Sequence, residues 1–464
     1  MARSQQQAYG QGNLRAPATD SSFTAKQVSV EDTNANSQQL APDTRALAGA
    51  QELSLGAPGL TRSFWQPLFG LMLTVDTNPL TAIRSSGLTT WSSLFGGIDV
   101  RRILGRSDLT LNYVGGGLIG DNTNSGNSIV QQLELSEKLT CRRTVISFLE
   151  QLSYLPEAAF GSYMSGGQSF SNANGPSLQP ALIPNQSILT TRGQRISQSF
   201  LTEVDRFLTP RSSVTAVGSY SLLRFLDNGF LNSGDTVLQV GYNYQLTPKD
   251  TIALLYRFTA LRFNNFDQSI HGHVTQVAFG RRITGRLAFH AAAGPEVAFF
   301  RTPVSTSMGT SGGSTTTSSL ARAYWTLNTS ITYQKRYTQF GLAYDHSVSG
   351  GAGVLPGAVS DQVSGSINSQ LRRSLDSGFV LGYAHNRELN VAAPTPSNQT
   401  YTYWFSGVNF THPWGRWTNV FLNYRLQFQN SNTSFCVGII CGQSFVRHTV
   451  SIGFGWSPRP IPIQ

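Results

Sequence analysis

The feature that most restricts the fold of this chain is a period of two in hydrophobicity, which recurs from about residue 64 to residue 457. In VFLNYRLQFQN (420–430) every second position is apolar and polar residues lie between, with Phe421 as the exception. VLQVGYNYQL (237–246) and HTVSIGFGW (448–456) follow the same rule. Because successive side chains of a strand point to opposite faces, each stretch predicts a β-strand with one apolar and one polar face.

Short turns and longer connections alternate between these strands. LTPRSSV (208–214) and LTPKDTI (246–252) are nearly the same turn, in which proline fixes φ and Ser or Asp can bond the backbone. Most short turns lie about 36 to 40 residues apart, which indicates one repeated unit of strand, turn, strand and longer loop. With FWQPLFGLMLTVDTN (64–78) as the first strand, both chain ends fall on the short-turn side, and we expect about 18 strands (16–18).

Composition helps to decide which strand face meets water. Charged residues make up only 12% of the chain, about half of what a soluble domain usually carries. A barrel of this strand number encloses a lumen too wide for side chains to fill, so its inner face must be hydrated. No run of about 18 apolar residues could form a membrane helix. We therefore predict an all-β, transmembrane, antiparallel up-and-down β-barrel whose apolar face meets lipid.

With short turns on one side and long loops on the other, residues 64–457 resemble a bacterial outer-membrane β-barrel of the porin-like class. The resemblance implies that the short turns face the periplasm and that barrel-assembly machinery inserts the chain. IGFGW (452–456) is similar to the terminal strand that this machinery reads, although SPRPIPIQ follows it. Two rows of aromatic side chains, called girdles, are expected at the lipid interfaces. For the girdles we select Trp91, Tyr244, Tyr333, Trp414, Trp417 and Trp456.

Parity along the strands selects the residues that should line a pore. They are Gln239, Asn243, Arg257, Arg282, Asn328, Asp345, Asn368, Arg372, Asn423, Arg425 and Gln427. Arginines outnumber acids in this set, which favours a modest preference for anions. An equally open alternative is that arginine–carboxylate pairs brace the wall without selecting ions. The net charge of +10 is consistent with an anionic partner, but no nucleic-acid-binding module is recognisable.

The longest connection, residues 155–192, is the third on the long-loop side and has only Glu157 and Arg192 as charges. The resemblance implies that it folds into the barrel as a constriction loop; a surface flap is the alternative. Cys436 and Cys441 could form a small disulfide. None of the seven histidines forms a catalytic motif, so we expect no enzyme, no cofactor and no metal site.

Residues 1–60 show no periodicity and are interpreted as a disordered extension preceding a barrel of residues 61–464. MARSQQQAYGQGNL (1–14) contains no apolar segment typical of a secretory signal, so a signal is expected outside the sequence given. The favoured function is an outer-membrane channel for passive diffusion of small polar solutes. A plugged structural or interaction barrel that presents its long loops, and a soluble β-repeat adhesin, stay open as alternatives. The sequence indicates no oligomeric state.

Overall fold

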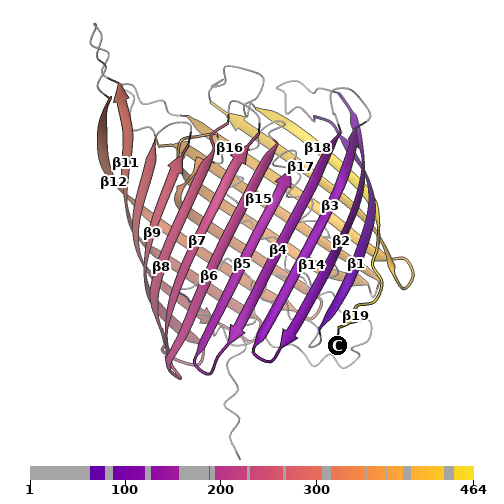
Figure 1. Cartoon of the computed structure of the whole chain (residues 1–464), viewed down its shortest axis with the longest axis horizontal. Coiled ribbons are helices and arrows are strands. Elements are labelled where there is room, and N and C mark those ends of the chain that lie inside the picture. Colours follow the sequence, from indigo (N-terminus) through magenta and orange to yellow (C-terminus); the bar gives the residue numbers. More distant parts are fainter. Residues whose placement is uncertain are drawn as a thin grey trace, which may run out of the picture.

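The computed structural model is a closed antiparallel β-barrel (Figure 1). It describes residues 47, 63–78, 87–120, 127–155, 188, 194–226, 230–264, 268–305, 315–351, 354–372, 374–389, 399–432 and 444–463. All strands belong to one 19-stranded sheet, in which consecutive strands from β1 to β18 pair with each other. Pairing of β1 with β18 closes the sheet into a barrel. Strand β12 extends past β13, so its residues 315–326 pair only with β11. In the described part of the chain, no helix is long and apolar enough to cross a membrane.

The strands have the following bounds: β1 Phe64–Asp76, β2 Thr89–Leu104, β3 Ser107–Gly120, β4 Ser128–Thr140, β5 Thr144–Leu155, β6 Arg195–Thr209, β7 Ser212–Phe225, β8 Ser233–Gln245, β9 Asp250–Phe263, β10 Ser269–Arg282, β11 Leu287–Ser305, β12 Thr315–Lys335, β13 Thr338–Ser349, β14 Ala358–Arg372, β15 Leu375–Glu388, β16 Thr400–Pro413, β17 Thr418–Ser431, β18 Phe445–Trp456 and β19 Ile461–Pro462. The eighteen long strands, β1 to β18, confirm the expected strand number. The two-residue β19 is an addition that pairs with the first residues of β1.

Both described ends of the sheet lie on the side of the tight turns (Figure 1). Strand β1 begins there, next to β19, and rises to the side of the long connections. The turns between β2 and β3 and between β6 and β7 each take only two residues. Gly105, in the first of these turns, has a φ of +55°, which a residue without a Cβ adopts readily.

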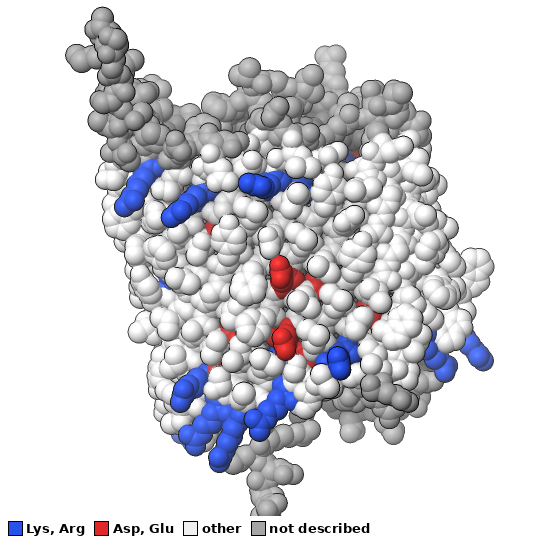
Figure 2. Space-filling model, viewed as in Figure 1, with Lys and Arg blue, Asp and Glu red and all other residues white. Residues whose placement is uncertain are grey.

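The two faces of the wall have opposite polarity. On β17, Leu422 is 43% exposed and points outward, whereas Gln427 is fully buried on the inward face. On β1, Leu71 is 49% exposed, and its inward neighbour Met72 is buried. Figure 2 shows an outer face with few charged side chains at mid-height and basic ones toward its two ends. The apolar side chains therefore form the outside of the barrel, as the hydropathy pattern predicts.

Gly294 in β11 allows two backbones to approach closely. A Cβ on Gly294 would lie 1.8 Å from the carbonyl oxygen of Thr275 on β10, so a larger residue cannot fit there unchanged. At this point the side chains of Gln276 on β10 and Thr326 on β12 meet across β11, where Nε2 of Gln276 donates to Oγ1 of Thr326 at 2.6 Å. Proline cannot donate to the ladder, so Gly294–Pro295 in the sequence predicts a bulge. The structure has none, because the register is the same on both sides: Val274 pairs with Glu296 and Val277 with Ala293.

Candidate functional site

The candidate site is the inner wall of the barrel, because a channel exposes its chemistry there. Residues that pair directly across strands share a face, so the register assigns the inward set strand by strand. Asn423 pairs with Ser451 on one side and with Asn409 on the other, and all three face inward. The inward faces of neighbouring strands thus present mostly Ser, Thr, Asn and Gln, with charges at intervals.

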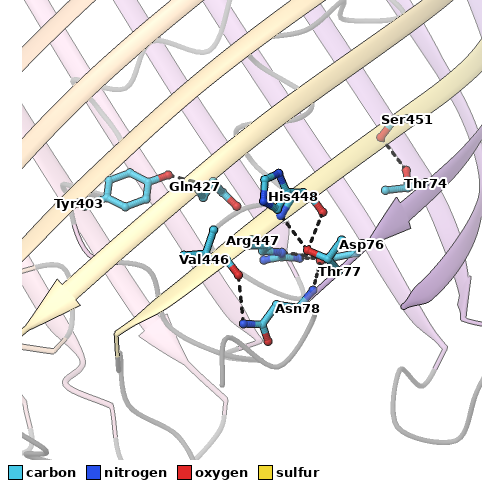
Figure 3. Close-up of polar contacts among 10 residues, drawn as sticks. All are labelled: Thr74, Asp76, Thr77, Asn78, Tyr403, Gln427, Val446, Arg447, His448 and Ser451. Atoms are coloured by element: carbon cyan, nitrogen blue, oxygen red, sulfur yellow. Dashed lines mark hydrogen bonds and ion pairs between the residues drawn. The ribbon is translucent and has the colours of Figure 1, made fainter. Parts of the chain in front are cut away.

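A buried ion pair crosses the seam where β18 meets β1 (Figure 3). Arg447 of β18 and Asp76 of β1 are 3% and 1% exposed. The Nε and Nη2 groups of Arg447 both donate to Oδ2 of Asp76, with the Nε contact at 2.8 Å. The other carboxylate oxygen, Oδ1, accepts the backbone N–H of Asn78 at 3.0 Å. The pair joins residues 371 positions apart, so it links the first and last long strands.

Further polar contacts continue along this seam (Figure 3). The hydroxyls of Thr74 and Ser451 lie 2.9 Å apart. The side chain of Asn78 donates to the carbonyl of Val446 at 3.2 Å. Nearby, Nε2 of Gln427 donates to the hydroxyl of Tyr403 at 3.0 Å, and both side chains are buried. Buried polar groups are stable when they are hydrogen-bonded, and this region meets that condition at several positions.

Acidic side chains outnumber basic ones on the inward face of the described strands, by register. The acids are Asp76, Asp99, Asp108, Glu134, Glu203, Asp205, Asp235, Glu296, Asp345, Asp376 and Glu388. The bases are Arg101, Lys138, Arg195, Arg257, Arg282, Arg322, Arg425 and Arg447. Some charges pair, as Arg101 does with Asp108 at 2.6 Å. Asp99 and Glu134 flank Asn112 on opposite sides and form an acidic row across β2, β3 and β4.

One part of the inner wall is apolar. Ala253 and Leu255 of β9, Ala278 of β10 and Ala292 of β11 all face inward and are almost completely buried. Leu47, which lies seventeen positions before the start of β1, packs against these four residues and is 3% exposed. We call Ala253, Leu255, Ala278 and Ala292 the alanine patch. Contact with Leu47 places that residue inside the barrel, near the tight-turn end.

A second apolar contact lies at the long-loop end. Ile188, the one described residue within the loop 156–193, packs with Leu355, Ala358 and Tyr401. Tyr401 is an inward residue of β16, paired with Asn386. Ile188 is 1% exposed, so at this point the long loop contacts the inner side of the barrel mouth.

The structure places most of the expected pore-lining residues on the inward face. These are Gln239, Asn243, Arg257, Arg282, Asn328, Asp345, Asn368, Asn423, Arg425 and Gln427. Arg372 instead lies exposed at a tight turn, after a register shift between Gln370 and Arg372. Asn328 donates to Asp345 at 3.3 Å, which joins two of the expected residues.

The expected girdle residues divide into three groups. Tyr244, Tyr333 and Trp456 point outward near the tight-turn ends of their strands. Trp414 and Trp417 are exposed at the turn between β16 and β17. Trp91 differs from the expectation, because it pairs with Thr74 on the inward face and packs against the buried cluster that includes Met72 and Phe95. Glu157, Arg192, Cys436 and Cys441 lie outside the described residues, so their expected roles stay predictions.

Sequence reasoning missed three parts of this site. The Asp76–Arg447 pair left no local signal, since the two residues come from opposite ends of the barrel. The acidic row of Asp99 and Glu134 lies on strands whose alternation is interrupted by glycine and by charged residues. The alanine patch could have been suspected from the run of small residues HAAAG (290–294).

No family model matches the chain, and no curated protein matches it in sequence. Solved structures with a similar shape include the outer membrane protein opdK from Pseudomonas aeruginosa, at 11% identity and a TM-score of 0.41, covering 85% of this chain and 99% of that chain. P. aeruginosa OccK2 (OpdF) in complex with glucuronate matches at 11% identity and 0.41, covering 87% and 99%. A BenF-like porin from Pseudomonas fluorescens Pf-5 matches at 12% and 0.43, covering 86% and 100%.

The closed barrel itself defines the class of protein. Eighteen antiparallel strands closed into a barrel, apolar outside and polar inside, pair their backbone groups with one another, as a bilayer requires, while enclosing a polar interior. The chain therefore folds as a transmembrane antiparallel β-barrel of porin-like architecture.

Proposed function

We propose that the protein is a channel through which small hydrophilic solutes cross the outer membrane by passive diffusion. The observation that supports this most is the opposite polarity of the two faces on the same strands, as at Leu422 and Asn423 of β17. An eighteen-stranded barrel is wide enough to leave an aqueous path, and a hydrogen-bonding lining replaces part of a solute's hydration shell.

We further propose that the lumen favours cations. The sequence favoured anions, because arginines outnumber acids among the residues first selected. The register adds carboxylates that the sequence pattern did not select, including Asp99, Glu134 and Asp235. The pairs Arg447–Asp76 and Arg101–Asp108 each remove one base and one acid, so the excess of acids on the inward face remains. Rings or rows of carboxylates along a pore raise the local concentration of cations.

Recording from planar bilayers in a KCl gradient tests both parts. The expected result is steady conductance with a reversal potential on the cation-selective side. The double variant Asp99→Asn with Glu134→Gln should shift that potential toward zero. Glu150→Gln is the matched control, because Glu150 lies on the outward face of β5, where it accepts a hydrogen bond from Gln198 at 3.1 Å. A barrel that never conducts would rule out the channel, and anion selectivity would reinstate the preference predicted from the sequence.

A plugged barrel is the second candidate, and the contacts of Leu47 and Ile188 favour it. Each residue is buried against the inner wall at a different end of the barrel. Under this alternative, the full chain does not conduct, and deletion of residues 160–188 or of residues 1–60 makes conductance appear. Under the channel proposal, the full chain conducts and the deletions change the size of an existing conductance.

A further inference from the structure

Three arginines stand on the outer face of the barrel near its long-loop end. They are Arg224 of β7, Arg262 of β9 and Arg301 of β11, and all three side chains are exposed. By register they share the outward face with Leu222, Ser269 and Phe299. We call Arg224, Arg262 and Arg301 the arginine row. Within the described part of the chain, none of the three forms an ion pair with a carboxylate.

The register brings the three side chains close together. Ser269 of β10 pairs with Arg262 on one side and with Arg301 on the other. Two strand spacings separate the two arginines, which corresponds to roughly 10 Å between their backbones. Gly234 of β8 pairs with Arg262 on its other side, and also with Leu222 of β7. Arg224 lies one outward position beyond Leu222. The positions between the arginines therefore hold a glycine and a serine, which do not cover the guanidinium groups.

The surroundings place the arginine row at the boundary of the apolar band. On the side toward the middle of the barrel, the outward residues are aromatic or aliphatic, among them Tyr220, Phe299 and Val297, which are all exposed. On the other side lie the long connections. Figure 2 shows basic side chains along the upper margin of this face, above a mostly uncharged area in which a few acidic side chains are visible. Among the described outward residues of β7 to β11, none in the half of each strand nearer the long connections is acidic.

We propose that the arginine row binds the phosphate groups of an anionic lipid in the outer leaflet. The apolar band fixes the depth of the lipid head groups, and the arginines lie at its upper limit. A guanidinium group presents N–H donors in a planar fork that matches two phosphate oxygens. One phosphate can contact Arg262 and Arg301 together over Ser269, whose hydroxyl can add a third donor. Aromatic side chains directly below, such as Phe299, can contact the acyl chains of the same lipid.

Lipid binding to the purified full-length protein tests the proposal. Native mass spectrometry in detergent would compare bis-phosphorylated lipid A with the same lipid after removal of its phosphates. We expect retention of the phosphorylated form and little of the other. The double variant Arg262→Gln with Arg301→Gln should lower the affinity by about tenfold or more, as expected for lost charge-assisted hydrogen bonds. Arg262→Lys with Arg301→Lys should recover part of it, because charge returns without the fork.

The matched control is Arg211→Gln with Arg286→Gln, which removes two exposed arginines from tight turns at the opposite end. It should leave lipid A binding unchanged. Heat-modifiable migration on gels checks that each barrel is folded, and single variants replace a double variant that fails to fold. Equal loss in the control, or equal binding of the dephosphorylated lipid, would overturn the proposal. Displacement of the lipid by millimolar inorganic phosphate alone would also overturn it, since the site would then select free anions.

Discussion

Two regions of the inner wall differ in the kind of side chain that they bury. At the seam of β17, β18 and β1, many of the buried side chains are polar, and several pair with one another, as Arg447 does with Asp76. At the alanine patch of β9, β10 and β11, the buried side chains are apolar and pack against Leu47. Both regions belong to the same inward face of one sheet. The inner face is therefore not uniformly polar. Its buried side chains include polar groups that pair with one another at the seam and apolar groups that Leu47 covers at the alanine patch.

The difference follows from the cost of burying polar groups. A carboxylate away from water is stable only when donors surround it, and Asp76 receives N–H groups from Arg447 and Asn78. An alanine needs no donor, but it gains free energy only when an apolar group excludes water from it. The seam therefore needs specific partners, whereas the alanine patch needs only a cover of suitable shape.

The largest effect is expected from Arg447→Ala. It leaves the Asp76 carboxylate buried without its cation, and breaking a buried pair in this way costs about 3–5 kcal/mol. The free energy of unfolding in urea, with the barrel in lipid vesicles, measures the loss. Arg101→Ala is the matched control, because its pair with Asp108 is partly exposed, at 16% and 34%. Equal losses in the two variants would show that burial does not distinguish the seam.

A smaller effect is expected from Leu47→Asp. The substitution replaces a buried apolar contact worth about 1.5–3 kcal/mol and should release position 47 from the alanine patch. In a chain without native cysteines, Ala278→Cys should react slowly with a water-soluble maleimide when Leu47 is present and faster when Leu47→Asp is added. Ala384→Cys, a buried inward residue elsewhere, is the control and should not change. Unchanged reactivity at position 278 would contradict the contact.

Gly294→Ala tests the close approach of β10 and β11 beside the alanine patch. The new Cβ would meet the Thr275 carbonyl oxygen, so one backbone must move, at a cost of about 1–3 kcal/mol. Gly117→Ala on β3 is the control, because no atom lies within 4 Å of its added Cβ. The urea midpoints of the two variants give the comparison. An unchanged midpoint for Gly294→Ala would mean that the strands are free to separate here.

The smallest effect is expected from Tyr403→Phe. It removes the hydroxyl that accepts a hydrogen bond from Gln427 at 3.0 Å, and one such bond is worth about 1 kcal/mol. Unfolding in urea again measures the change, with Tyr244→Phe on the exposed outward face as control. A loss as large as that of Arg447→Ala would indicate that the seam acts as one cooperative network and not as separate contacts.

The sequence alone determined the strands, their number and the orientation of most wall residues. These properties are local, because alternation with a period of two assigns each residue to one face of its own strand. Leu422 falls on the apolar face and Arg425 on the polar face. Where that period is absent, the prediction was wrong. In WSSLFGG (91–97) no alternation indicates a face, and Trp91 points inward. At Arg372, a shift in register breaks the alternation from which an inward orientation was predicted.

Only the tertiary structure decided which residues of distant strands contact one another. Closure of the sheet brings Asp76 to Arg447, and no pattern within either strand encodes that meeting. It also places Leu47 on the alanine patch and sets Arg262 and Arg301 on either side of Ser269. The numbers of acidic and basic side chains that face the lumen likewise depend on how the strands pair. Alternation is a property of one strand, whereas pairing depends on the register among strands that are far apart in the chain.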